Sequence, residues 1–256
     1  TDTTNNSMYT HDVSGTDDSA AQNTAYGFQA LDAITTGDDN TAIGFAAGSA
    51  ITTGLYNIAI GSYAGDALVG GTKNVAIGYA ALSTEDSYGK NVAIGYEALK
   101  VQNAAADAHN VAIGHQAGKA VTTGTNNVLV GSGTGDALTE GDYNVAIGNE
   151  AGGAINTGER NVLMGYAAGD AITTGDYNTA VGHGALSTED TTGGSTAFGY
   201  KALNLQNAGA DPHNVAVGYE AGKSVTTGTN NTIIGSTAGD SIQDGAHNTL
   251  LGYDAG

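Results

Sequence analysis

The pentapeptide Asn-Val-Ala-Ile-Gly, or a close variant of it, occurs fourteen times in this chain at an almost fixed interval. Eleven of the thirteen intervals are 17 residues and the other two are 19. Self-similarity at so short a period indicates a solenoid, in which each coil contacts mainly its neighbours. It argues against the usual enzyme architecture, in which unlike loops converge on one pocket. The copies begin at Asn23, Asn40, Asn57, Asn74, Asn91, Asn110, Asn127, Asn144, Asn161, Asn178, Ser195, Asn214, Asn231 and Asn248.

Two positions of the coil, counted from its Asn as position 1, are almost invariant along the chain. Position 5 is Gly in every copy, which predicts either a positive φ or a close backbone approach. Position 1 is Asn in thirteen copies, and stacked amides of this kind can hydrogen-bond along a coil axis as a ladder. The alternative is that Asn only tolerates a corner geometry. Both positions are therefore predicted to be structural, as represented by Asn40, Gly44, Asn74, Gly78, Asn110, Gly114, Asn144, Gly148, Asn214 and Gly218.

The remaining positions of the coil predict short strands. Positions 2 and 4 carry β-branched or larger apolar residues at the two-residue period of a strand. Position 8 is Ala in thirteen copies and is expected to point into a tight interior. The second half of many coils reads Ala-Ile-Thr-Thr-Gly, as at Ala33–Gly37, Ala50–Gly54 and Ala171–Gly175, which predicts a second strand ended by a Gly turn.

These patterns predict an all-β parallel β-helix or β-roll of about fourteen coils over residues 23–256. A helical fold is disfavoured, because 41 of the 256 residues are Gly and each Gly inside a helix costs about 1 kcal/mol. Residues 1–22 form an N-terminal segment, in which residues 6–22 are expected to make a degenerate capping coil and residues 1–5 to be disordered. Both ends of the chain look like cuts in a longer polypeptide.

A longer period of 104 residues overlies the short one. Ser83–Asp86 returns as Ser187–Asp190, and the two 19-residue coils are related in the same way. Six coils therefore form one super-repeat. The extra residues of the long coils, within 102–109 and 206–213, are expected to bulge from one face.

Composition excludes several classes of function. The net charge is −19, and without a cluster of Lys or Arg the chain is not expected to bind nucleic acid or anionic lipid. No apolar run approaches the roughly 20 residues that span a bilayer. The absence of Cys excludes disulfides and thiolate metal sites.

No constellation in the sequence predicts catalysis, a cofactor or a metal centre. The six His residues are scattered rather than set at metal-ligand spacing, and no Ser/His/Asp set stands out from the repeats. The calcium-binding nonapeptide pattern is also missing, although binding of cations between acidic surfaces stays open. Lys119 and Lys223 occupy position 10 one coil before Asp136 and Asp240, which predicts two exposed ion pairs between neighbouring coils, each worth about 0.2–1 kcal/mol.

Aromatic residues at position 6 are the candidates for recognition. Tyr79, Tyr96, Tyr200 and Tyr219 represent this column, and the inserted coils add His109 and His213. Tyr and Phe beside hydroxyl and amide groups suit a glycan or a host surface protein. The alternative, which we favour, is that the rings shield the coil or pack between chains.

The motif Asn-x-Ala-Ile-Gly-x-x-Ala, seen at Asn40–Ala47 and Asn74–Ala81, resembles the head repeat of YadA-like trimeric autotransporter adhesins and related repeats in tail fibres of aquatic bacteriophages. The resemblance covers about residues 23–256 and implies a left-handed β-roll and a homotrimer. A trimer is also reasonable physically, because each coil offers few apolar side chains to its own core. The Thr-Thr-Gly extension and the duplicated super-repeat lean towards the phage fibres.

The leading hypothesis is therefore a structural segment of a trimeric extracellular fibre that supports host attachment, in a virion tail fibre. The first alternative is a bacterial adhesin head at the cell surface. The second is an ice-binding or glycan-binding solenoid that uses the Thr-Thr pairs, although several coils lack the pair.

Overall fold

A computed structural model describes residues 8–9, 19–85 and 87–256, and within it the chain divides into two compact units, Thr1–Asn126 and Asn127–Gly256. The expected disorder of residues 1–5, most of the capping coil and Asp86 lie outside the described residues. In the described part β1 pairs with β2 so that Met8 is opposite Thr24. This register is one residue shorter than the 17 that counting back from Asn23 to Asn6 predicts.

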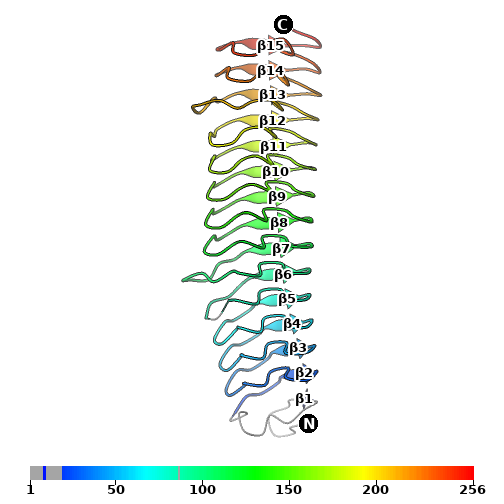
Figure 1. Cartoon of the computed structure of the whole chain (residues 1–256), viewed down its shortest axis with the longest axis vertical. Coiled ribbons are helices and arrows are strands. Elements are labelled where there is room, and N and C mark those ends of the chain that lie inside the picture. The colour runs from blue at the N-terminus through cyan, green and yellow to red at the C-terminus, as the bar shows by residue number, and fades with distance from the viewer. Residues whose placement is uncertain (1–7, 10–18, 86) are drawn as a thin grey trace. The chain divides into compact units, whose positions relative to one another are not determined.

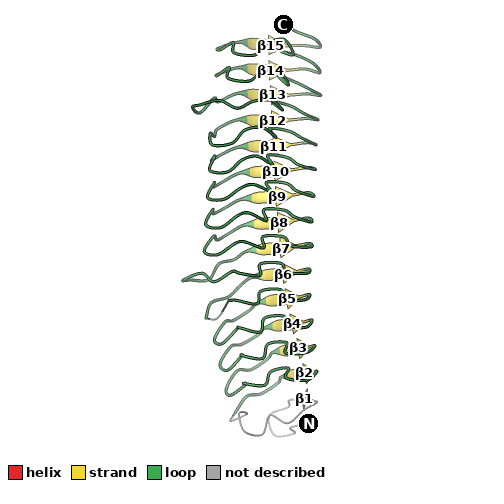
Figure 2. Ribbon diagram, viewed as in Figure 1, coloured by secondary structure: helices red, strands yellow, loops and turns green. Residues whose placement is uncertain are grey.

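Each coil contributes one three-residue strand, and the strands of each unit are parallel and pair in chain order (Figure 1). The described residues contain strands and loops but no helix (Figure 2). The predicted all-β parallel solenoid is thus confirmed, while its handedness and its trimeric state stay predictions. The first unit contains β1 (Met8–Tyr9), β2 (Thr24–Tyr26), β3 (Thr41–Ile43), β4 (Ile58–Ile60), β5 (Val75–Ile77), β6 (Val92–Ile94) and β7 (Val111–Ile113). The second contains β8 (Val128–Val130), β9 (Val145–Ile147), β10 (Val162–Met164), β11 (Thr179–Val181), β12 (Thr196–Phe198), β13 (Val215–Val217), β14 (Thr232–Ile234) and β15 (Thr249–Leu251).

The two long coils keep the strand register by placing their extra residues in a loop. Val75 is opposite Val92, and Val92 is in turn opposite Val111 despite the longer spacing. In Figure 1 the loop before β7 and the loop before β13 extend beyond those of the adjacent coils of the same unit. The predicted bulges are therefore present.

The core of each unit is narrow, because only the middle residue of each strand points inward. Ala76 in β5 is fully buried, whereas Ile58 at the start of β4 is 39% exposed. The Ala at position 8 is fully buried in every coil from Ala30 to Ala238, as predicted, and Thr134 replaces it with its hydroxyl donating to Gly148 O at 2.6 Å. Positions 2 and 4 thus face outward and form what we call the outer strand face.

The side chains at positions 9 and 12 compensate for each other in the core, and the 17-residue period alone does not reveal this. Where position 9 is Gly, position 12 is a large apolar residue, and a Cβ on Gly48 would lie only 2.8 Å from Ile51 Cδ1. Where position 9 is a buried Leu, as at Leu203, position 12 is usually a buried Glu or Gln. Gln206 then joins a polar network, because it donates to Glu189 Oε2 at 2.7 Å and accepts from Asn214 Nδ2 at 2.8 Å.

The invariant Asn and Gly residues have the structural roles that were predicted. The Asn57 side chain donates to Gly71 O at 2.7 Å within its own coil, and its Oδ1 accepts the backbone N–H of Asn74 in the next coil at 3.0 Å. The Asn ladder is therefore confirmed, with most links running from side chain to backbone. Gly44 has φ +136°, and a Cβ there would lie 2.6 Å from Gly61 O. Both a positive φ and a close approach require Gly at position 5.

The predicted second strand of each coil is wrong. Residues 33–37, 50–54 and 171–175 form turns and bends. The N–H groups of Thr35, Thr36 and Gly37 all donate to Thr52 O, at 3.1, 3.1 and 3.0 Å. Three donors that converge on one carbonyl cannot form the evenly spaced ladder of a parallel strand pair.

Candidate interaction surface

The outer strand face carries apolar side chains that the coils themselves do not cover. Its position-4 residues include Ile43, Ile113 and Ile234, each 38% exposed. Position 2 adds Val, Ile or Thr in every coil. The inward-facing middle residue is a small Ala in most strands, and a Leu or Ile in β8, β10, β14 and β15. In the strands with Ala, the larger apolar side chains lie on the outside of the sheet.

Most strands are followed by an aromatic residue at position 6, and neighbouring rings of this kind form columns within each unit. In the first unit Tyr79 and Tyr96 stack with their ring centroids 5.3 Å apart, and Tyr96 stacks on His115 at 5.2 Å. In the second unit Tyr200 stacks on Tyr219 at 5.1 Å. These spacings are close to the 4.7–4.9 Å separation of paired strands. The stacked rings therefore cover one another's faces and expose mainly their edges, whereas Tyr63 in the first unit meets Phe45 and Tyr79 edge to face.

The two recognition candidates from the inserted coils lie elsewhere. His109 and His213 are the last residues of the two long coils, directly before the next Asn, and are equivalent to position 17 of the 17-residue coils. The strand therefore separates them in sequence from the position-6 rings. His109 Nδ1 lies 3.1 Å from Asp107 O, and His213 lines a separate pocket. Among the described residues, no ring contact joins either His to the position-6 column.

Position 17 forms a second column, which the sequence analysis did not single out. Its residues have positive φ whatever their type, between +49° at His213 and +63° at Lys90 for those other than Gly. Arg160 lies between two tyrosines of this column, with its guanidinium carbon 5.4 Å from the Tyr143 ring centroid and 5.5 Å from that of Tyr177. A cation at this distance from two ring faces is attracted by both.

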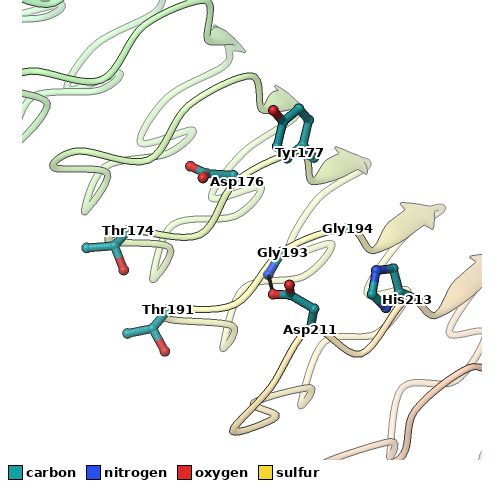
Figure 3. A pocket seen from close by; sticks show the side chains of 8 residues that line it. All are labelled: Thr174, Asp176, Tyr177, Thr191, Gly193, Gly194, Asp211 and His213. Carbon is teal, nitrogen blue, oxygen red and sulfur yellow. Dashed lines mark hydrogen bonds between the residues drawn. The ribbon is translucent and has the colours of Figure 1, made fainter.

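A pocket of about 410 Å³ lies in the second unit, where this column is interrupted (Figure 3). Three successive coils contribute its wall: residues before β11, residues before β12, and Asp211 with His213 before β13. Asp211 Oδ1 accepts the Gly193 N–H at 3.1 Å, as the dashed line in Figure 3 marks. The lining consists of Thr174, Asp176, Tyr177, Thr191, Gly193, Gly194, Asp211 and His213.

The predicted ion pair between Lys223 and Asp240 is wrong. The Lys223 ammonium binds the Glu220 carboxylate at 2.9 Å, three residues earlier, and Asp240 accepts a hydrogen bond from Ser241. Glu220, at position 7 of the same coil, thus takes the place that was predicted for the Asp of the next coil as the partner of Lys223. Lys119 and Asp136 belong to different units, and their pairing stays a prediction. A pair between coils does occur at Lys90 and Asp107, 2.7 Å apart.

Four carboxylates among the described residues have pKa values displaced by their surroundings, and the hydrogen bond with Lys90 lowers the pKa of one of them, Asp107. Hydrogen bonds from Lys100 and Gln116 lower the pKa of Glu97, in spite of partial desolvation. Burial raises the pKa of Asp66 and of Asp170, which are equivalent residues of the two super-repeats. Oδ1 of each of these two Asp residues is buried without a hydrogen-bond partner, which explains why the charged form is disfavoured.

Neither a metal centre nor a membrane-spanning helix occurs in the part of the chain that the structure describes. No group of three His, Asp or Glu side chains there is placed to hold a metal ion, and no helix there is long and apolar enough to cross a membrane. Comparisons with protein-family models, with curated proteins and with solved structures found no significant match to this chain.

Proposed function

We propose that this chain is a structural segment of a homotrimeric extracellular fibre, in a virion tail fibre that supports host attachment. The observation that carries the proposal is the uncovered outer strand face. Burying apolar surface contributes about 25 cal/mol per Å², and a face repeated on every coil of a unit gives each unit a strip of its own for association with identical chains. Each chain then gains a second buried face beside its narrow core.

The placement in a phage fibre, rather than in a bacterial adhesin head, follows the resemblance of the repeat and the copied super-repeat. Glycan binding by the aromatic column is less favoured, since stacked rings offer edges where sugar recognition uses ring faces. Ice binding by the Thr-Thr pairs is also less favoured. The first hydroxyl of such a pair is already used, as in Thr226, which donates to Gln243 O at 3.0 Å.

The test is the mass of the protein in solution. A chain of 25.3 kDa gives a trimer of 3 × 25.3 = 75.9 kDa, which light scattering coupled to size-exclusion chromatography resolves from a monomer. We expect Ile77→Asp combined with Val181→Asp to dissociate the trimer, because these equivalent residues place charge on the outer strand face of both units.

The matched control moves the same chemical change away from the strands. Val101 and Leu205 are equivalent exposed residues of the long coils, 36% and 45% exposed, so Val101→Asp combined with Leu205→Asp should leave the trimer intact. Circular dichroism checks that both variants keep their β structure. A wild-type protein that is a stable monomer at micromolar concentration contradicts the proposal.

A further inference from the structure

The pocket beside Gly194 lies where the second super-repeat lacks a residue that the first one has. Adding 104 to Lys90 gives Gly194, and adding 104 to Asp107 gives Asp211. The neighbouring Gly and His residues are the same in both repeats. The first unit therefore shows how this arrangement looks when a cation is present.

In the first unit both oxygens of the Asp107 carboxylate are used. Oδ1 accepts the Gly89 N–H at 3.1 Å, and Oδ2 binds the Lys90 ammonium at 2.7 Å. In the second unit Asp211 Oδ1 accepts the Gly193 N–H at the same distance of 3.1 Å. With Gly in place of Lys, Asp211 Oδ2 has no hydrogen-bond or ion-pair partner among the described residues. The Asp211 carboxylate is held by a backbone N–H equivalent to the one that holds Asp107, but the sequence has no Lys at position 194 to pair with it.

The aromatic residues at position 17 add a second argument. In the two coil intervals before the pocket, the guanidinium of Arg160 fills the space between Tyr143 and Tyr177. In the next two intervals Gly194 stands between Tyr177 and His213, and its missing side chain leaves the pocket open (Figure 3). The gap between rings two coils apart thus occurs twice. Arg160 fills the first gap with its guanidinium, and Gly194 has no side chain to fill the second.

The charge of the pocket agrees with both observations. Asp176 and Asp211 contribute two carboxylates, and no Lys or Arg is among the lining residues. Asp176 Oδ1 is held in place by the N–H of Glu159 at 2.7 Å. A carboxylate already oriented by a backbone N–H binds a cation without the entropic cost of ordering that carboxylate.

We propose that the Gly194 pocket binds an external organic cation, the ammonium or guanidinium group of a Lys or Arg side chain or of a free polyamine. The group lies against Asp211 Oδ2, between the rings of Tyr177 and His213, and takes the place that Lys90 fills in the first unit. The argument for this site does not use the trimeric assembly proposed above, since all the residues named in it belong to one chain.

The proposal is tested by saturation-transfer NMR on the full chain with four probes: Nα-acetyl-lysine methylamide, Nα-acetyl-arginine methylamide, spermidine and the uncharged Nα-acetyl-norleucine methylamide. We expect the cationic probes to bind and the norleucine probe not to bind. Asp211→Asn keeps the acceptor for the Gly193 N–H but removes the charge, and should weaken binding at least tenfold.

Asp107→Asn is the matched control. It alters the equivalent carboxylate, whose cation Lys90 already supplies, so binding of the probes should be unchanged. Gly194→Lys should abolish binding, because its own ammonium can reach Asp211. The left-handed backbone at Gly194 (φ +76°) is close to that of Lys90 (φ +63°), so this substitution has a precedent in the same fold.

The outcomes of these binding measurements either overturn the cation site or assign its ligand. Equal binding of the norleucine probe, or unchanged binding to the Asp211→Asn variant, overturns the proposal. Equal weakening in the Asp107→Asn variant overturns it as well, since the effect is then one of total charge. Binding of spermidine but of neither amino-acid probe assigns the site to a free polyamine, and the reverse assigns it to a basic polypeptide.

Discussion

Replacing two glycines of one coil separates the two reasons for which a solenoid needs glycine. Gly131 occupies position 5 with φ +143°, and a Cβ there would lie 2.6 Å from the carbonyl carbon of Gly148 and 2.5 Å from Thr134 Oγ1. Gly133, two residues later, has φ +62°, and the nearest atom to its Cβ would be Glu150 Cγ at 3.8 Å. One position is both strained and crowded, and the other is only left-handed.

The expected costs follow from this geometry. Gly131→Ala forces a residue into a region open essentially to Gly alone, at about 1–3 kcal/mol. It also displaces the carbonyl that accepts the Thr134 hydroxyl, at about 0.5–1.5 kcal/mol, so we expect a loss of about 2–4 kcal/mol. For Gly133→Ala the left-handed conformation costs about 1–2 kcal/mol, and the stiffer unfolded chain returns about 0.4–1 kcal/mol. The net loss is about 1 kcal/mol.

The assay is urea unfolding followed by circular dichroism, together with hydrogen exchange of the Gly148 amide, which donates to Val130 O at 2.8 Å. Local exchange is needed because a stack of repeats need not unfold in one step. Gly131→Ala should accelerate exchange at Gly148 much more than Gly133→Ala does. If both variants lose the same stability, crowding between coils is not what fixes Gly at position 5, and the reasoning fails.

Three further predictions concern side chains. Asp66→Asn combined with Asp170→Asn should raise the melting temperature at pH 7, because the raised pKa of each Asp means that its charged form destabilises the fold. The gain should fade as the pH falls through the raised pKa of the folded protein and be absent below the ordinary value of 3.8, and a gain that persists at pH 3 would argue against desolvation as its cause. Asn57→Ala should cost about 2–3 kcal/mol in urea unfolding, since it leaves Gly71 O and a backbone N–H of the next coil buried without partners; a cost below 1 kcal/mol would mean that water replaces the ladder. Arg160→Gln should lower the melting temperature and Arg160→Lys should lower it less, because the ammonium keeps the attraction to the two rings; equal effects would assign the role of Arg160 to packing alone.

The sequence predicts what depends on a residue type that varies little. Asn, as at Asn57, occupies position 1 of thirteen coils, and Gly, as at Gly44, occupies position 5 of all fourteen. The corner geometry at these positions admits few other residues. The bulged loops could likewise be predicted. Because the strands of neighbouring coils keep a fixed register, the two extra residues of a long coil must lie in a loop outside the stack. The buried position of Ala81, and of the other Ala residues at position 8, follows from the same regularity.

Features that depend on backbone conformation without a matching residue type could not be predicted. Tyr56, Lys90 and Glu97 all have positive φ, although none of them is a residue that usually marks the left-handed region. Stacking of the coils imposes the conformation, so propensity carries no signal. The prediction of a second strand in each coil was wrong for a related reason. Thr and Ile favour strands locally, but the stacked coil turns at these residues. The Gly194 pocket could not be predicted from the 17-residue period. The replacement of Lys90 by Gly194 is seen only when the two super-repeats are aligned residue by residue.

The distribution of charge is a further argument for the outer strand face as the surface of assembly. Positions 2 and 4 of fourteen coils make 28 residues, and none of them is charged, although 13% of the chain is. An even distribution would place about four charges there, and depletion of charge is typical of the core of an interface. The net charge of −19 is therefore carried by the remaining faces, where it opposes association of further copies. In the proposed trimer, the uncharged face would be buried while charge on the remaining surface repels further copies, and this combination favours a closed oligomer over open aggregation.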